Sequence, residues 1–239
     1  MTTSSRTSER SGRRTVRPLE PGHNCPRCPR LVEFRKAWRT REPTWFNGPV
    51  PSFGPRDARV LIVGLAPGLQ GANRTGRPFT GDFAGDLLYE TLIDYGFARG
   101  HYAARCDDGL TLLDCRITNT VRCVPPENKP TGAEIAHCRD FLKSTIREMS
   151  HLRVIVALGR IAHDSVVVSA GGRPAAAAFA HGRSHPFDGL TLYDSYHCSR
   201  YNTNTGKLTP PMFHAVFAAV RARLDAPSPS AEATCGGNV

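Results

Sequence analysis

Short apolar runs alternate along the chain with segments whose apolar residues recur at helical spacing. The runs are typical of buried strands and cover residues 59–64, 115–120, 153–159 and 190–197. The run over 153–159 is apolar after its first residue, Arg153, which indicates a strand buried on both faces. Strands that alternate with helices predict an α/β domain with a mostly parallel sheet.

Three helices can be placed between and after these strands. Leu88, Leu92 and Tyr95 share one helical face. A capping box from Thr131 to Glu134 opens a second helix. The apolar face of this second helix holds Ile135, Cys138, Leu142, Ile146 and Met149. The last helix begins where Pro210 follows Thr209, and its apolar face holds Phe213, Phe217 and Val220.

Ligands of parallel sheets bind at the carboxyl ends of the strands, and three of these strands run directly into unusual loops. We therefore expect those three loops to form one site.

The two ends of the chain differ from the region between them. Residues 1–20 are mostly Ser, Thr and Arg and predict a disordered basic arm, and residues 226–239 predict a second disordered tail. Residues 21–225 are expected to form a single domain. The first 20 residues contain no apolar stretch typical of a secretory signal, and no apolar run reaches the length of a membrane span. These features predict a cytoplasmic protein.

The chain is basic, with 31 Lys and Arg against 21 Asp and Glu and a formal net charge of +10. The arm holds five Arg and two Glu, so most of the positive charge belongs to the body. A basic body favours a polyanionic partner, nucleic acid before an acidic membrane.

The cysteines include one closely spaced pair, Cys25 and Cys28, in a CxxC motif that suits both zinc and iron–sulfur clusters. Cys123 and Cys138 lie far downstream and are separated from each other. Zinc sites favour a second close pair, whereas scattered cysteines suit a cubic cluster. Ordinary buried thiols remain the alternative interpretation. The other cysteines, Cys106, Cys115, Cys198 and Cys235, have no partner at comparable spacing.

A glycine-rich loop over residues 64–86 follows the first strand. Glycines let the backbone approach a ligand closely and turn its N–H groups inward. The loop matches neither the phosphate-binding P-loop nor the GxGxxG dinucleotide fingerprint. Phe79 is an aromatic residue that can stack on a flat ligand. Asp82 precedes a helix, so it can be either a reactive carboxylate or an N-cap.

The second and fourth strands each end in a polar residue. Asn119 carries a donor and an acceptor side by side, which match one edge of a nucleobase, although a turn asparagine is the alternative. His197 is either reactive or a satisfied histidine at a strand end. The polar loop after it, which includes Arg200, suits contacts with phosphate.

Four strings of the sequence, together with the CxxC motif near its start, resemble the iron–sulfur uracil-DNA glycosylases of family 5, also called type B. They are GLAPG (64–68), GANRTGRPFTGD (71–82), TNTVRC (118–123) and SYHCSRYNTNTG (195–206). The resemblance implies a three-layer α/β/α fold with a central four-stranded parallel sheet. It also implies a 4Fe–4S cluster bound by Cys25, Cys28, Cys123 and Cys138.

The resemblance further implies a monofunctional DNA repair enzyme that is expected to act as a monomer near the nucleoid. It would flip uracil out of double-stranded DNA and hydrolyse the N-glycosidic bond, leaving an abasic site. Hypoxanthine and ethenocytosine are further expected substrates. The base pocket would consist of Gly64, Ala66, Gly68, Gln70, Phe79 and Asn119. Ser199, Arg200 and Asn202 would contact DNA.

The implied catalytic residues are Asp82, His197 and Asn119. His197 would stabilise the negative charge on the departing base, and Asn119 would bind its Watson–Crick edge. The best-known uracil glycosylases carry a water-orienting aspartate two residues beyond the first glycine of this loop, but this chain has Ala66 there. Asp82 is the nearest carboxylate, and we expect it to orient the attacking water. The small Ala66 side chain leaves room for larger bases.

Two other functions fit parts of the sequence. One is a non-enzymatic nucleic-acid-binding protein whose cysteines hold zinc. The other is a small-molecule enzyme that uses the glycine loop to bind a nucleotide, which would show no affinity for DNA.

Overall fold

The computed structural model describes residues 20–187 and 189–226. The expected arm and tail therefore lie outside the described residues, except for Glu20 and Ala226 at their inner ends. Glu20 belongs to the folded body: its carboxylate accepts a hydrogen bond from the Ser52 hydroxyl at 3.1 Å and lies 3.3 Å from Arg122.

The centre of the fold is a five-stranded sheet in the order β4-β1-β5-β7-β6. The first four of these strands are parallel, as the sequence predicts: β4 (Cys115–Asn119), β1 (Val60–Gly64), β5 (Val154–Leu158) and β7 (Leu190–Ser195). The fifth strand, β6 (Ser184–Phe187), was not predicted; it pairs antiparallel with β7 at the edge of the sheet. It is short and contains Pro186, which an edge strand tolerates.

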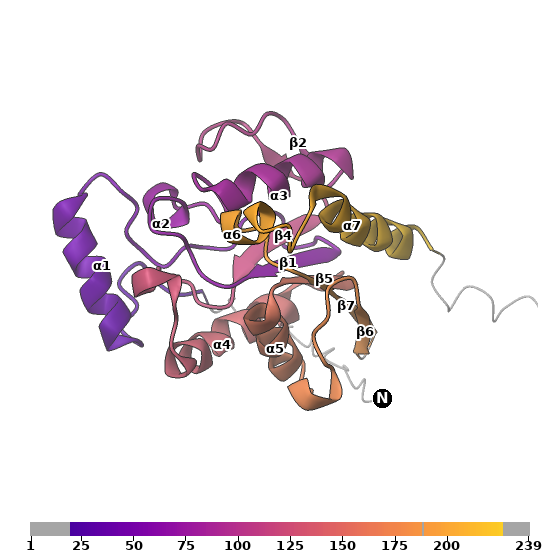
Figure 1. The fold of residues 1–239 in the computed structure, drawn as a ribbon. Coiled ribbons are helices and arrows are strands. Elements are labelled where there is room, and N and C mark those ends of the chain that lie inside the picture. The colour runs from indigo at the N-terminus through magenta and orange to yellow at the C-terminus, as the bar shows by residue number, and fades with distance from the viewer. Residues whose placement is uncertain (1–19, 188, 227–239) are drawn as a thin grey trace, which may run out of the picture.

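Helices cover both faces of the sheet (Figure 1), so the three-layer α/β/α architecture is confirmed. One face packs against α3 (Phe83–Asp94) and α7 (Pro210–Asp225), and the other against α4 (Gly132–Glu148) and α5 (Arg160–Ser169). Alternate residues of each strand point to opposite faces. Ile62 therefore joins the first core and Leu61 the second.

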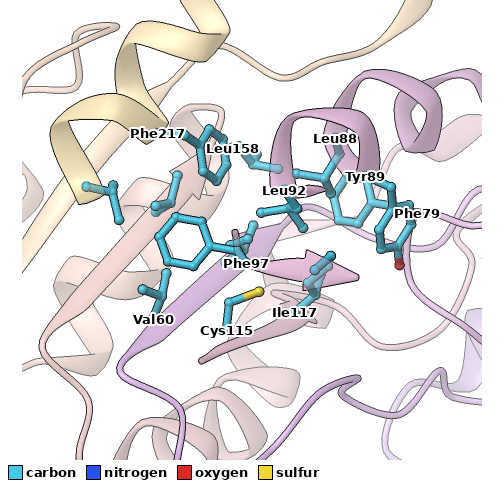
Figure 2. Packing of buried hydrophobic residues seen from close by; sticks show 14 of the residues in the cluster. Val60, Phe79, Leu88, Tyr89, Leu92, Phe97, Cys115, Ile117, Leu158 and Phe217 are labelled. Atoms are coloured by element: carbon cyan, nitrogen blue, oxygen red, sulfur yellow. The ribbon is translucent and has the colours of Figure 1, made fainter. Parts of the chain in front are cut away.

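The larger core lies between the sheet and α3 and α7. Figure 2 shows Val60 and Ile117 of the strands facing Leu92 of α3 and Phe217 of α7. All four of these side chains are fully buried. Phe79 lies at the end of this cluster, so the position of the glycine-rich loop depends on the same core.

The remaining elements are short or peripheral. They are α1 (Pro29–Arg41), α2 (Ala72–Thr75), α6 (Arg200–Asn204), the hairpin of β2 (Ala98–Arg99) and β3 (Thr111–Leu112), and two 3-10 turns, η1 (Pro126–Asn128) and η2 (Pro174–Ala176). Helix α1 follows the CxxC motif and lies to one side of the sheet, near α2 (Figure 1). Arg30 ties it to α4, donating to both carboxylate oxygens of Glu134 at 2.8 and 2.7 Å. Within 20–187 and 189–226, no helix has the length and apolarity to cross a bilayer.

Candidate active site

The carboxyl ends of β1, β4 and β7 open into one cleft of about 890 Å³, as the sequence predicts. The cleft is lined by Ala66, Gly68, Gln70, Phe79, Asp82, Asn119, His197, Ser199 and Arg200, together with Asp86, Ala104 and Asn128. The structure thus brings together most of the residues predicted for the site. Two predicted site residues do not line this cleft. Gly64 packs against the Asn119 and Phe79 side chains, and Asn202 lines a neighbouring cavity of about 380 Å³.

Gly64 shows why the first strand must end in glycine. It pairs in register with Asn119 across β1 and β4. A Cβ on Gly64 would lie 2.4 Å from Asn119 Oδ1 and 2.6 Å from Phe79 Cζ, so any side chain would displace both. Asn119 is buried, and its Oδ1 accepts no hydrogen bond from the described residues. A buried acceptor without a partner costs free energy unless a ligand or water supplies a donor.

Asp82 occupies the N-cap position of α3, but its side chain makes no capping hydrogen bond. Its carboxylate points instead at the glycine-rich loop: Oδ2 lies 2.8 Å from the place of a Cβ on Gly68 and 2.4 Å from that on Gly71. Oδ1 is buried and accepts no hydrogen bond within the described part of the chain. Burial raises the pKa of Asp82, and the nearby backbone N–H groups of Gly85 and Ala84 oppose this shift more weakly. A desolvated carboxylate beside a cleft is a suitable proton acceptor.

His197 follows the end of β7 by two residues and lines the cleft. Its ring stacks on Phe79, with centroids 5.8 Å apart and planes 28° apart. Burial lowers the pKa of His197 to about 4, so the imidazole is neutral near pH 7. A neutral imidazole can donate one hydrogen bond from one nitrogen, which fits a role at a developing anion.

A buried hydrogen-bond network holds the end of β7 just before His197. Asp194 accepts hydrogen bonds from His163 Nδ1 at 2.6 Å and from His185 Nε2 at 2.9 Å. These three side chains lie close enough together to suggest a metal site, but the distances are those of hydrogen bonds. The Tyr196 N–H donates to His181 Nδ1 at 3.1 Å, which fixes the backbone next to His197. The sequence offered no signal for this network, because its members are distant in the chain and follow no pattern.

The rim of the cleft beyond His197 is formed by the short helix α6. Ser199 caps it, accepting a hydrogen bond from the Asn202 N–H at 3.4 Å. The guanidinium of Arg200 lies over the Phe83 ring at 5.2 Å. Asn202 Nδ2 donates to the His197 carbonyl oxygen at 2.8 Å, so this predicted DNA contact also holds the loop that carries His197.

Tyr201 is a residue that the sequence reasoning missed. It is 74% exposed, more than the other exposed large apolar residues of the described chain. An exposed aromatic ring beside a cleft needs an explanation, since most such rings are buried. The sequence feature that could have indicated Tyr201 is its position between Arg200 and Asn202, in a loop expected to contact DNA.

The four cysteines of the predicted ligand set meet on one side of the sheet. Cys25, Cys28, Cys123 and Cys138 line a small enclosed cavity together with Arg35, Arg122, His137 and Phe141. Arg35 donates to Cys123 Sγ at 3.2 Å, and the Arg122 N–H donates to Cys138 Sγ at 3.4 Å. Burial raises the pKa of Cys28 to about 11 and that of Cys123 to about 12, so both thiols keep their protons near pH 7 in the absence of a metal.

Four cysteine thiols are the donor set of a 4Fe–4S cluster and also of a structural zinc site. The cavity lined by Cys25, Cys28, Cys123 and Cys138 therefore fits a metal group that four thiolates bind.

The cysteine cavity adjoins the cleft. Cys123 lies in the short loop that follows Asn119. In the same loop, the Val121 N–H donates to the Leu65 carbonyl oxygen at 2.9 Å, which joins the loops after β4 and β1. Ala66 packs against the cysteine cluster and also lines the cleft. The loops that follow β1 and β4 thus contact both the cleft and the cysteine cavity.

Comparison with known proteins agrees with this geometry. Residues 51–221 match the model of the uracil DNA glycosylase superfamily. The chain is 45% identical over 201 residues to a type-5 uracil-DNA glycosylase of Thermus thermophilus, covering 81% of this chain and 90% of the relative. The chain belongs to the type-5 uracil-DNA glycosylase family. Type-5 enzymes of Pyrobaculum aerophilum and Mycobacterium leprae are 41% and 42% identical, over 78% and 81% of this chain and 83% and 88% of their own lengths.

Membership of the type-5 family makes this chain a glycosylase, an enzyme that hydrolyses N-glycosidic bonds. The resemblance drawn from the four sequence strings is thereby confirmed. The non-enzymatic zinc protein and the small-molecule enzyme are both set aside.

Proposed function

We propose that this glycosylase removes uracil from DNA by flipping the nucleotide into the cleft and hydrolysing its N-glycosidic bond. The observation that carries the proposal is the cleft itself, in which an aromatic ring, an amide with an unpartnered oxygen, a neutral imidazole and a desolvated carboxylate line one cavity. The names of the type-5 relatives support uracil as the base.

Phe79 and Asn119 would bind the flipped base. The Phe79 ring offers a face for stacking, and Asn119 Oδ1 lies beside it without a donor. Uracil presents an N3–H donor next to its O4 acceptor, which complements the oxygen and the NH₂ group of an asparagine amide. Binding uracil would thus satisfy a polar atom that is otherwise buried without a partner.

His197 would assist departure of the base. Cleavage places negative charge on uracil, and a neutral imidazole N–H beside the base can stabilise that anion by a hydrogen bond. The low pKa of His197 fits a donor that remains neutral. Asp82 would orient the attacking water and offset the positive charge that develops on the sugar, a role that Ala66 cannot fill.

The breadth of substrates is the finer part of the proposal. The methyl group of Ala66 leaves the cleft wide at about 890 Å³, which favours acceptance of hypoxanthine and ethenocytosine besides uracil. Double-stranded DNA is the proposed substrate because α6 offers a phosphate-binding guanidinium on Arg200 and an exposed ring on Tyr201. An inserted ring can fill the space that a flipped base vacates in a duplex.

The proposed cofactor is a 4Fe–4S cluster on Cys25, Cys28, Cys123 and Cys138. When bound, it would supply iron–thiolate bonds that tie the N-terminal CxxC motif and α4 to the loop after Asn119. The chain's own contribution is the hydrogen bonding of Arg35 and Arg122 to the sulfur atoms. A single domain over 21–225, a monomeric state and a place near the nucleoid remain predictions.

A cleavage assay tests the proposal. Duplex and single-stranded oligonucleotides of one sequence, carrying uracil, hypoxanthine, ethenocytosine or an undamaged base, are incubated with the enzyme and then treated with alkali. The account predicts alkali-sensitive breaks at uracil in duplex DNA and none at the undamaged base. Absence of breaks at uracil with iron-loaded protein would contradict it. Breaks that appear before alkali would contradict the monofunctional mechanism.

A further inference from the structure

Phe79 has a backbone conformation that its own residue type does not favour. Its φ is +51°, in the left-handed region where aromatic residues are rare. Such a conformation costs about 1–3 kcal/mol and persists only where the surrounding structure fixes it. The contacts that fix Phe79 therefore also determine where its ring lies in the cleft.

The hydroxyl of Tyr102 makes two of these contacts. It donates to the Phe79 carbonyl oxygen at 3.1 Å and accepts from the Gly81 N–H at 3.4 Å. The hydroxyl thus bridges the backbone on both sides of Thr80. Gly85 makes room for the bridge, since a Cβ there would lie 2.0 Å from the Phe79 oxygen and 2.2 Å from Tyr102 Oη.

The Tyr102 ring is itself held in place. It stacks on the Tyr89 ring with centroids 4.6 Å apart. The guanidinium of Arg77 lies 5.4 Å from the Tyr89 ring and 5.8 Å from the Tyr102 ring. Asp108 binds that guanidinium through both oxygens at 2.8 and 2.7 Å. The hydroxyl that bridges the loop is therefore carried by a rigid stack outside the cleft.

We infer that Tyr102 is a positioning residue for base recognition: its hydroxyl holds the strained backbone of Phe79 so that the ring faces the flipped base. This inference rests on the proposed function of Phe79 as the stacking residue. Tyr102 lies outside every sequence string that identified the family. Burial raises the pKa of Tyr102 to about 12, so the hydroxyl keeps its proton at the pH of an assay.

The test uses Tyr102→Phe, which removes only the hydroxyl. Binding of the full-length, iron-loaded protein is measured with two duplexes of the same sequence. One carries a 2′-fluorinated deoxyuridine that resists cleavage, and the other carries a tetrahydrofuran abasic analogue. Tyr193→Phe is the matched control, because its hydroxyl makes no hydrogen bond to a described residue.

We expect Tyr102→Phe to weaken binding of the uracil duplex by about tenfold, the size of one lost buried hydrogen bond. Binding of the abasic duplex should change by less than about twofold, because that duplex offers no base to stack. In a Phe79→Leu background, Tyr102→Phe should have no further effect on the uracil duplex. Tyr193→Phe should bind both duplexes as the wild type does.

Three results would overturn the inference. Equal weakening of both duplexes would show a merely structural role, and unchanged binding of both would show that the hydroxyl does not act on Phe79. Additive effects with Phe79→Leu would show that Tyr102 acts elsewhere. A wild type that does not distinguish the uracil duplex from an undamaged duplex would instead refute the proposed function itself.

Discussion

The carboxylate of Asp82 lies directly against Gly71. A Cβ on Gly71 would come within 2.4 Å of Asp82 Oδ2 and 2.8 Å of its Cγ. The carboxylate therefore leaves no room for a side chain at Gly71. The glycine-rich loop thus leaves room for a reactive group of its own chain as well as for a ligand.

Gly71→Ala is expected to displace the Asp82 carboxylate and to slow uracil excision by at least about tenfold. Overpacking also costs about 1–3 kcal/mol of stability, which a thermal melt will detect. Gly132→Ala is the matched control: a Cβ there meets nothing within 4 Å, and the position lies in the first turn of α4. That control should keep full activity and a melting temperature at or above the wild-type value. Wild-type rates for Gly71→Ala would show that the Asp82 position is unimportant.

The sequence allowed the sheet and its site to be predicted because both depend on local patterns. The strand ending at Gly64 is an apolar run, and the strand ending at Asn119 alternates apolar and polar residues. Unusual loops follow both strands, and parallel pairing brings their ends together. Strand β6 was missed because a four-residue segment with a proline carries no strand signal of its own. It is held in place by pairing with β7.

The missed parts of the site depend on contacts that no local pattern encodes. Tyr102 reaches Phe79 across 23 residues, and His163 reaches Asp194 across 31. The two possible roles of Asp82, helix cap and reactive carboxylate, likewise depend on where its side chain lies in the fold. Both an N-cap and a reactive carboxylate fit the sequence. In the structure Asp82 holds the N-cap position of α3 and its carboxylate also lines the cleft, so one side chain occupies both places.

His197→Ala should slow excision by about 100-fold, the usual cost of removing a donor to a developing anion. The pKa of His197 is about 4, so the ring is neutral from about pH 6 to pH 8. The ratio of the wild-type rate to the His197→Ala rate should therefore stay constant across that range. Single-turnover rates at several pH values measure this ratio. A ratio that changes near pH 6.5 would indicate that His197 titrates normally and would contradict a role as neutral donor.

Cys25→Ser should lower the iron content and the melting temperature together, because metal binding and folding are coupled. Cys106→Ser is the control: Cys106 is exposed and does not line the cysteine cavity. Iron per chain and the thermal midpoint are measured on both variants. Full iron and stability in Cys25→Ser would remove this residue from the ligand set.

Tyr201→Ala should reduce excision from duplex DNA by about tenfold and leave excision from single strands nearly unchanged. The reason is that an inserted ring replaces stacking lost when a base leaves a duplex, and a single strand has little such stacking to replace. Tyr201→Phe keeps the ring and should retain the duplex rate. Equal losses on both substrates would show that Tyr201 acts on the fold or on chemistry instead.

The single-turnover rate of Asp82→Asn on a uracil duplex tests the central claim most directly, since this substitution removes the charge and keeps the size. Burial raises the pKa of Asp82, so the charged carboxylate disfavours folding at pH values above that pKa. The variant should therefore melt no lower than the wild type and bind duplex DNA equally well. We predict a rate about 100- to 10,000-fold below that of the wild type, as for loss of a general base. A rate equal to that of the wild type would contradict the account and leave Asp82 as a helix-capping residue.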